Sequence, residues 1–496
     1  MAKANDFETA TYSYNTARQR FSEDANVHYR YTSAEELINN KEDLQEMIQH
    51  HQEKQVKRLK TLKNYYLGNN EAILQANRRK EDDKADHRAT HNYAKYVSQF
   101  IQGYLVGIPI KMTYNDEEEG NTSDYLKEIN RDNEADEHNS DLVLDLSIFG
   151  RAYELLYRSN DDVTTFTNVD VETAFVIYDD TIEMNPIAAV RYVRNKFKDN
   201  KYNVTLYTTQ QEIKYETKDA NLYELKEIER KPHAFDGVPI IEYQNNKYRQ
   251  GDFENVLNLI DLYDSAQSDI ANYMTDFNDA MLYIAGRLGL ESIDDNPINA
   301  VKKMKDANIL YIEPPEYGDR EGRADAGYLY KQYDVNGTEA YKTRVENDIH
   351  KFTNTPNLND EKFSGTQSGE SMKYKLFGLE QVRATKERLF KKSLRNRYRL
   401  INNISTIARE GSFDANDITI TFTPNLPKSL QEEIDNFNAL GGQLSQETIL
   451  STLSIVENPQ EEIEKLRNEN PTERQRQQMY NDATWNQDSE EVMENG

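Results

Sequence analysis

The run Thr353–Gly378, TNTPNLNDEKFSGTQSGESMKYKLFG, decides how this chain folds, because a turn-rich loop opens there directly into a long helix. Turn-forming residues fill Pro356–Gly369, and no proline follows until Pro424. The pattern predicts a helix that begins near Ser368 or Ser371, continues to about Arg409 and ends at Gly411. About forty residues of helix span about 60 Å, which is typical of a large assembly or a coiled coil rather than of one compact core.

The composition describes a large, acidic chain without cysteine. It has 496 residues and a formal net charge of −27, which predicts several domains around a sizeable core. The lack of cysteine excludes disulfides and thiolate metal sites and is compatible with a reducing compartment. Tight DNA binding needs clustered Lys and Arg, so the charge argues against DNA binding by the whole surface and suits a conduit that repels DNA.

No membrane segment is expected. The first residues, MAKANDFETA, lack the apolar core of a signal peptide. The most apolar stretch, Tyr96–Ile110, is too short to span a bilayer.

The first half of the chain reads as helices followed by strands. We expect a loosely ordered arm at residues 1–34, because this stretch is polar and has no clear period. Helical spacing predicts helices at Glu35–Leu67, His91–Val106, Ser123–Asn133 and Asn139–Phe149, with a strand at Ile110–Tyr114. From Ala152 to Tyr243 the period changes to two, which predicts one antiparallel β region.

A second long helix is predicted at Gly251–Gly286. Its apolar residues keep a 4-3 spacing, with the polar Gln267 as one member: Val256, Ile260, Tyr263, Gln267, Ile270, Met274, Phe277, Met281 and Ile284. The segment has no Lys or Arg before Gly286 and seven acids: Asp252, Glu254, Asp261, Asp264, Asp269, Asp276 and Asp279. Helical geometry places Asp261, Asp264, Asp276 and Asp279 on one stripe away from the apolar seam.

Shorter elements follow on both sides of the long helix. We expect helices at Pro297–Ala307 and Thr338–Phe352, strands at Ile309–Ile312 and Gly327–Tyr333, and a charged loop at Pro314–Ala326 between these strands. Beyond the long helix, the pattern predicts a strand at Ile418–Thr423 and helices at Leu430–Leu440 and Gln446–Val456, extended by Gln460–Asn468. The polar stretch Pro471–Gly496 is predicted to be disordered.

Patterns that imply catalysis or metal binding are weak. His87 and His91 stand four apart, as in a helical zinc site, but the HExxH glutamate is absent, and an N-cap at Asp86 or Thr90 explains the pattern more simply. The acid pairs Asp179-Asp180 and Asp294-Asp295 fit solvated loops better than cation sites. The chain has no GxxxxGK[ST] or GxSxG motif. We therefore expect neither cofactor nor enzyme activity.

The run Lys386–Arg399 is basic and has two interpretations. It holds seven cations against the single acid Glu387: Lys386, Arg388, Lys391, Lys392, Arg395, Arg397 and Arg399. It could form a DNA-binding patch, or it could neutralise acidic neighbours, which is the interpretation we favour in a chain this negative. Apolar residues at helical spacing predict that one face is buried in either case.

Three stretches of the sequence resemble the portal proteins of tailed phages, of the type found in phages of Gram-positive hosts. They are NLNDEKFSG..SGE.MKYKLFGLE from Asn357, DHRATHNYAKYVSQFIQGYLVGIPI at Asp86–Ile110, and FTPNLPKSLQEEIDNFNALGGQLSQET at Phe422–Thr448. They occur in the order found in that family, and the resemblance covers roughly residues 35 to 465. Residues 1–34 and 471–496 carry nothing that matches.

The resemblance implies an α+β portal fold assembled as a dodecameric ring, with a thirteenth subunit when the protein assembles alone. It implies a wing at 35–250, stem helices at 251–286 and 338–353, a clip at 287–337, a tunnel loop at 354–369, a long wing helix at 370–410 and a crown at 411–470. The implied role is a channel at one capsid vertex, in the virion and during assembly in the host cytoplasm. The implied partners are double-stranded DNA, the terminase large subunit, a head-completion protein, and the major capsid and scaffolding proteins.

Candidate residues follow from this division. The tunnel loop would contact DNA through Asn357, Asn359, Asp360, Glu361, Lys362 and Phe363. The acidic stripe Asp261, Asp264, Asp276 and Asp279 would line the stem. The clip would dock the packaging motor through Glu313, Glu316, Asp319, Arg320 and Arg323. In a ring, one weak contact such as Lys362 is multiplied by the number of subunits.

Two other classes remain open at this point. A capsid-associated, metal-dependent nuclease would need two or three acids converging on one point, whereas the acids here are spread over stripes and loops. A coiled-coil scaffold would fit the heptad seam but not the β region or the Pro/Gly-rich insert.

Overall fold

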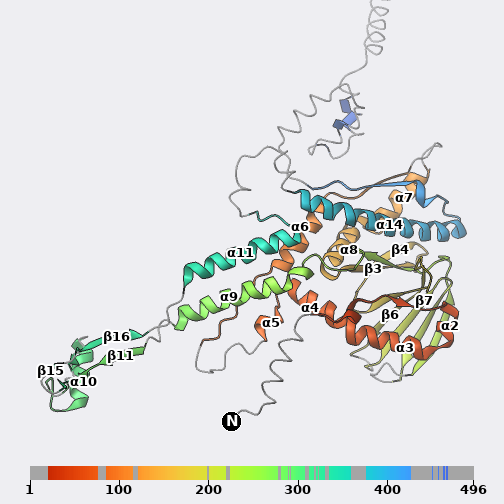
Figure 1. Ribbon diagram of the computed structural model, residues 1–496. Coiled ribbons are helices and arrows are strands. Elements are labelled where there is room, and N and C mark those ends of the chain that lie inside the picture. Colours follow the sequence, from red (N-terminus) through yellow and green to blue (C-terminus); the bar gives the residue numbers. More distant parts are fainter. Residues whose placement is uncertain are drawn as a thin grey trace, which may run out of the picture. The chain divides into compact units, whose positions relative to one another are not determined.

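The structure is a computed structural model in which two units are described separately: Met1–Asn425 and Leu426–Gly496. It describes residues 20–75, 85–114, 121–197, 200–218, 224–276, 281–288, 290, 292–307, 312–314, 316–317, 320–321, 323–329, 334–358, 376–425, 449–450, 456, 462–463 and 465–466. The first unit mixes helices and sheets, as the α+β prediction requires (Figure 1).

The predicted helix Glu35–Leu67 is divided into several shorter helices, and two short elements precede them. They are η1 (Glu23–Asn26), β1 (Tyr29–Arg30), α2 (Ala34–Asn39), α3 (Lys41–His50), the π-helical η2 (His51–Gln55), α4 (Val56–Tyr66) and α5 (Glu71–Leu74). The break falls at Asn40, whose ψ of 79° is not helical and which follows one helix and precedes the next. α4 ends within one residue of the predicted Leu67, and Gly68, with φ +82°, follows.

The prediction of a loosely ordered arm is wrong for residues 20–34. Tyr29 is buried, and β1 pairs in parallel with β5 (Ala174–Tyr178). Tyr29 packs against Phe175, and its hydroxyl hydrogen-bonds to His50. Aromatic burial therefore fixes a segment whose polar sequence gave no periodic signal.

Two larger sheets form the described β region, where the sequence predicted one. The first has six strands in the order β1-β5-β6-β7-β8-β9, and the second has three in the order β10-β3-β4. The strands, besides β1 and β5, are β3 (Arg151–Arg158), β4 (Thr164–Val169), β6 (Pro186–Arg194), β7 (Tyr202–Thr208), β8 (Gln211–Thr217), β9 (Leu225–Pro232) and β10 (Ile240–Gln244).

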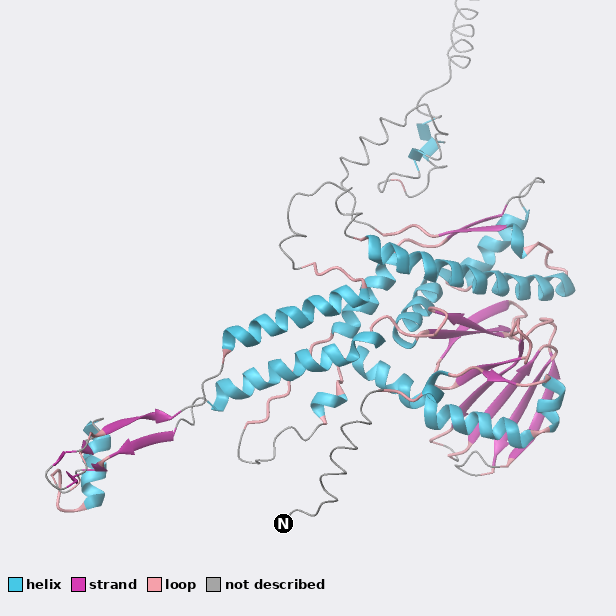
Figure 2. Ribbon diagram, in the orientation of Figure 1, coloured by secondary structure: helices cyan, strands magenta, loops and turns pink. Residues whose placement is uncertain are grey.

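Each sheet has its own apolar core, covered by helices (Figure 2). Leu37, Leu44 and Ile48 of α2 and α3 pack on the six-stranded sheet. The three-stranded sheet packs with α8 (Ala135–Phe149), with α14 (Phe377–Ala408) and with α7 (Asn121–Asp132). The α6 helix (Tyr93–Val106) lies against α8.

The strand β2 (Lys111–Tyr114) pairs antiparallel with β17 (Ile418–Thr421), which follows the 3₁₀ turn η5 (Ala415–Asp417). Residues 411–425 therefore belong to the first unit and not to a separate crown. Buried Phe413, Ile418, Ile420 and Phe422 place this segment in the same core as α14.

The two predicted long helices are shorter than expected. α14 begins at Phe377 and ends at Ala408, with Arg409 in the left-handed conformation at φ +61°. The prediction for Gly251–Gly286 is wrong beyond Asp276: α9 covers Leu257–Asp276, preceded by η3 (Glu254–Val256), and Met281–Ala285 form β11. β11 pairs with β16 (Asp325–Leu329), so pairing with a distant strand overrides the continuing heptad spacing.

Between β11 and β16 the described residues form α10 and two short strand pairs. α10 spans Pro297–Ala307 as predicted. β12 (Arg287–Leu288) pairs with β13 (Ile312–Glu313), and β14 (Glu316–Tyr317) pairs with β15 (Arg320–Glu321). The segment predicted as a charged loop thus contains a small hairpin. α11 (Val335–Thr353) follows.

In the second unit, the described residues 449–450, 462–463 and 465–466 are helical, and Lys465 pairs with Glu462 at 3.5 Å. The predicted helix Leu430–Leu440 and the stretch Pro471–Gly496 lie outside the described residues.

Candidate functional site

The helices α9 and α11 form an antiparallel hairpin that starts and ends beside the cores of the two sheets (Figure 1). Leu257 and Ile260 of α9 and Val345 and Ile349 of α11 are buried. Twenty residues of α9 span about 30 Å. The predicted seam is buried in its first half, whereas Met274 is 55% exposed.

The two described members of the predicted acidic stripe, Asp261 and Asp264, are held inside the subunit and do not form an exposed row. Asp264 is fully buried, and its carboxylate accepts hydrogen bonds from the His91 backbone N–H at 2.8 Å and from Asn70 Nδ2 at 2.9 Å. His91 Nδ1 lies 2.9 Å from the same carboxylate. The prediction that Asp264 lines a channel is therefore wrong, because segment 85–92 covers this face of the helix.

Asp261 is also held within the subunit. Its carboxylate accepts from Tyr65 Oη at 2.5 Å and Asn70 Nδ2 at 3.0 Å, and it pairs with Arg20. Its side chain keeps 20% of its exposure, so it contributes little to an open acidic surface. The side chain of Asp276 and the whole of Asp279 lie outside the described residues.

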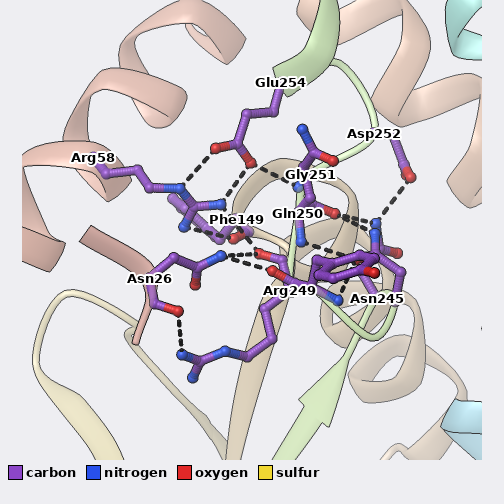
Figure 3. Close-up of polar contacts among 11 residues, drawn as sticks. Asn26, Arg58, Phe149, Asn245, Arg249, Gln250, Gly251, Asp252 and Glu254 are labelled. Atoms are coloured by element: carbon purple, nitrogen blue, oxygen red, sulfur yellow. Dashed lines mark hydrogen bonds and ion pairs between the residues drawn. The ribbon is translucent and has the colours of Figure 1, made fainter. Parts of the chain in front are cut away.

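Two buried ion pairs attach the base of the hairpin to the sheet cores. Glu254, just before α9, accepts from Arg58 at 2.5 and 2.7 Å and from the Gly251 backbone at 3.0 Å (Figure 3). Asp252 pairs with Lys386 of α14 at 2.7 Å, while its other oxygen accepts from Asn245. Burial lowers the pKa of Lys386, and the Asp252 carboxylate partly offsets this.

The N-terminal segment joins the same junction. Asn26 donates to the carbonyls of Tyr248 and Arg249, and Arg249 donates back to the carbonyls of Asn26 and Val27 (Figure 3). Arg249 also pairs with the buried Glu242 at 3.3 Å. Sequence reasoning missed these residues, because single polar positions in a segment without a period carry no signal of their own.

The basic run of α14 divides into buried and exposed cations. Arg397 is fully buried and pairs with Glu154 at 2.5 Å, while Lys391 pairs with Glu387 at 2.6 Å. For these residues and Lys386, the favoured interpretation, neutralisation of acidic neighbours, is confirmed. Arg388, Lys392, Arg395 and Arg399 are exposed instead.

The Glu154–Arg397 pair is the most deeply buried ion pair on α14. Burial alone would raise the pKa of Glu154, but Arg397 and a hydrogen bond from His138 outweigh it and lower the pKa to about 2. Tyr243 also donates to this carboxylate at 3.0 Å, and the Arg397 guanidinium lies 4.4 Å from the centre of the Phe166 ring.

The histidines contact side chains of the same subunit. His87 Nε2 lies 2.8 Å from Thr275 Oγ1, and His51 Nδ1 lies 2.8 Å from Tyr192 Oη. The N-cap of α6 is Asn92, which accepts from the Lys95 backbone, so the predicted cap at Asp86 or Thr90 is wrong. Over the described ranges, no three His, Asp or Glu side chains gather in a way that could hold a metal ion.

The acid pairs predicted to lie in solvated loops stabilise turns. Asp179 accepts from Thr181 and Asn185 in the β5–β6 connection. Asp294 accepts from the Asn296 backbone and pairs with Lys303 at 2.7 Å.

Of the predicted tunnel loop, 354–369, the structure describes only residues 354–358. Asn357 donates to Glu346 of α11 at 3.2 Å, and the Pro356 carbonyl accepts from Tyr96. A Cβ at Gly378 would come within 2.7 Å of Asn354 Oδ1, so the start of the loop lies beside the first turn of α14. Asn359, Asp360, Glu361, Lys362 and Phe363 lie outside the described residues.

The predicted docking residues lie on short strands. Glu313 on β13 accepts from Ser292 at 2.8 Å. Glu316 and Arg320 stand on the paired strands β14 and β15, and Arg323 is exposed. Asp319 lies outside the described residues. The structure thus brings Glu316 and Arg320 onto one hairpin and leaves Glu313 on another strand pair.

Within the described residues, no helix combines the length and the apolar character that are needed to cross a bilayer.

Comparison with known proteins gives a consistent result. The family described as "Phage portal protein, SPP1 Gp6-like" matches residues 45–476. The portal protein of Bacillus phage SPP1 is 23% identical over 407 residues, which cover 78% of this chain and 77% of that protein. The portal protein of Clostridium phage phiCD119 is 25% identical over 431 residues, which cover 82% and 90%. The resemblance inferred from three short stretches thus extends over most of the sequence, and the chain belongs to the SPP1 Gp6-like family of phage portal proteins.

Proposed function

We propose that the chain assembles into a homo-oligomeric ring of about twelve subunits at one vertex of a phage capsid. Double-stranded DNA passes through the central channel, inward during packaging by the terminase motor and outward during ejection. The ring also nucleates assembly with the major capsid and scaffolding proteins. Membership of the portal family and the α9–α11 hairpin support this proposal.

The hairpin carries most weight among the structural observations. The ion pairs Arg58–Glu254 and Lys386–Asp252 hold the segment just before α9. They therefore fix the orientation of the hairpin at this end. Such long elements suit packing against a neighbouring subunit around a ring axis. We propose α9 and α11 as the stem, residues 281–329 as the clip and the elements around the two sheets as the wing.

The burial of Asp264 changes how the channel wall is proposed to work. Repulsion of DNA by an acidic wall would keep the duplex free to slide. This role would fall to Asp269, which is exposed, and to Asp276 and Asp279, rather than to Asp261 and Asp264. The crown is proposed to begin after Asn425, because residues 411–425 pack with the first unit.

The clip is proposed to dock the terminase large subunit during packaging and a head-completion protein afterwards. Glu313, Glu316, Asp319, Arg320 and Arg323 would supply the charged contacts. The protein would act as a channel and a docking platform, without catalysis or a cofactor of its own.

The mass of the purified protein, together with negative-stain images, tests the ring. Twelve copies of the 57.8 kDa chain predict a particle of about 694 kDa with an annular top view, or one subunit more. A particle of two or three subunits would contradict the proposal and favour a scaffold. Cleavage of plasmid DNA in the presence of magnesium would favour a nuclease instead.

The tunnel loop has a separate test. We expect Lys362→Asp to lower the yield of packaged DNA without dissociating the ring, because twelve reversed charges would meet the duplex at one level. Packaging yield and particle mass are measured together. Normal titre and normal packaged DNA length would contradict a DNA role for this loop.

A further inference from the structure

Four cations of α14 lie in a line on its exposed face. Arg388, Lys392, Arg395 and Arg399 are separated by four, three and four residues, which places them on one face of a helix. Eleven residues of rise give this line a length of about 16 Å. The opposite face of α14, with Phe390, Leu394 and Tyr398, is buried in the core. We call these four residues the basic stripe.

The acids of α14 are already bound by other cations. Glu380 accepts from Arg383 at 2.9 Å, and Glu387 accepts from both Arg383 and Lys391 at 2.6 Å. Arg388 donates only to the Ala384 carbonyl, and Arg399 only to Asn396. Across the ranges that the structure describes, no carboxylate lies within ion-pair distance of the basic stripe. In a chain with 87 acids and 60 cations, four such cations in one line are unexpected.

The surroundings of the stripe are polar and not apolar. Between Gln381 and Asn402, α14 exposes no large hydrophobic side chain among its described residues. Gln381 and Thr385 are exposed on the same side, and Asn396 and Asn402 are half-buried beside it. Arg395, Arg399 and Asn402 also line an open hollow of about 440 Å³, where Asp414 is bound by Asn416 of its own turn.

This chemistry distinguishes between two kinds of partner. A protein partner is usually recognised through a buried apolar or aromatic centre surrounded by a polar rim, and this surface has no such centre. Phosphate oxygens are bound by Arg and Lys together with Asn, Gln and Thr, which are the residue types found here. A duplex presents a negative charge about every 1.7 Å along its axis, so a line of about 16 Å meets several phosphates.

We propose that the basic stripe binds the phosphate backbone of duplex DNA lying along α14, without sequence preference. Three of the four cations are arginines, whose planar guanidinium can hold two phosphate oxygens at once. The stripe is a second DNA contact, distinct from the tunnel loop. The proposal rests on the proposed function only for the source of the DNA.

The test measures binding of a fluorescent 40-base-pair duplex of arbitrary sequence at about 50 mM salt, with anisotropy as the readout. The stripe variant replaces Arg388, Lys392 and Arg395 by Gln. A matched control replaces Lys54, Lys57 and Lys60, three exposed cations of η2 and α4, by Gln, so both variants lose the same charge. Particle mass is recorded for each protein.

We expect the stripe variant to bind at least tenfold more weakly than the control, and the slope of log K against log salt to fall by about 2 to 3 units. Equal binding by the two variants, or no binding by the wild type, would overturn the proposal. Loss of the ring in the stripe variant alone would also overturn it and assign the stripe to a subunit contact. Direct binding of fluorescent polyglutamate by the wild type but not by the stripe variant, with equal DNA affinity of the two proteins, would also overturn the proposal and indicate an acidic protein partner. A wild type that binds DNA through the stripe without forming rings would leave this inference standing while the proposed function fails.

Discussion

Arg397 and Arg151 are both fully buried, but their surroundings differ. Arg397 pairs with Glu154 and donates to Asn139 at 2.9 Å. Among the described residues, no side-chain nitrogen of Arg151 has a hydrogen-bond partner, and burial lowers the pKa of Arg151 to about 10. Arg397 neutralises the buried carboxylate of Glu154, whereas Arg151 places a positive charge in the core without an ion-pair partner among the described residues.

The two arginines should therefore respond differently to replacement by methionine. Arg397→Met leaves Glu154 buried without its cation and should cost about 3–5 kcal/mol of unfolding free energy. Arg151→Met removes an unpaired charge and should be neutral or stabilising. Urea denaturation of both variants checks this. Equal destabilisation by the two changes would show that Arg151 has a partner in solution.

Asp145 predicts a pH dependence near neutrality. Burial, with Asp170 and Asp141 nearby, raises the pKa of Asp145 to about 7 from 3.8. Between these values the folded state holds a proton that the unfolded state has released, so stability falls as pH rises from about 4 to about 7. Asp145→Asn should weaken this fall and melt at a higher temperature than the wild type at pH 8. Glu137→Gln, at an exposed site of α8, is the control and should follow the wild type.

The acids of α9 show what a sequence pattern leaves undecided. Periodicity places Asp261 and Asp264 on one side of a helix, and the structure agrees. Periodicity does not show that Tyr65, Asn70 and His91 cover that side, because these residues are distant in sequence from α9 and a helical period does not reveal what packs against the helix. The side of α9 that was predicted to face a channel is instead packed against other residues of the same subunit.

The Asp264 carboxylate of α9 holds residues 85–92, the segment before α6, through its hydrogen bonds. Asp264→Ala leaves the buried donors of His91 and Asn70 without an acceptor, and should cost on the order of 3 kcal/mol. Hydrogen–deuterium exchange should rise in residues 85–92 and hardly elsewhere. Asn258→Ala, at an exposed position of α9, should change neither quantity. Unchanged exchange in the Asp264 variant would mean that other contacts hold this segment.

Elements were predictable where local signals decide them. Pro297 begins α10 and the helix ends at Ala307, as the sequence indicates, because proline favours a first helical turn. Met281 and Ile284 continue the heptad spacing of α9, yet they lie in β11 because β16 supplies a partner strand. The division into two sheets could not be predicted either, because alternating polar and apolar residues indicate a strand but not which strands pair with it.

For the proposed ring, charge should govern how readily the subunits assemble. Twelve copies of a chain with a net charge of −27 bring several hundred negative charges together. Salt screens this repulsion, since the Debye length falls from about 30 Å at 0.01 M to about 3 Å at 1 M. The fraction of protein in rings should therefore rise severalfold between low and high salt, as measured by mass photometry. A larger ring fraction at low salt would instead indicate that attractive ion pairs dominate the subunit contacts.

The pairing of β2 with β17 also affects the order of events during synthesis. Lys111–Tyr114 must wait for Ile418–Thr421, roughly 300 residues downstream. A ribosome adding about 5 to 20 residues per second needs about 15 to 60 s to cover that distance. Throughout this interval the first unit lacks a strand and part of its core. A nascent chain therefore cannot offer a finished surface to other subunits, and recruitment into the proposed ring would be delayed until the protein is nearly complete.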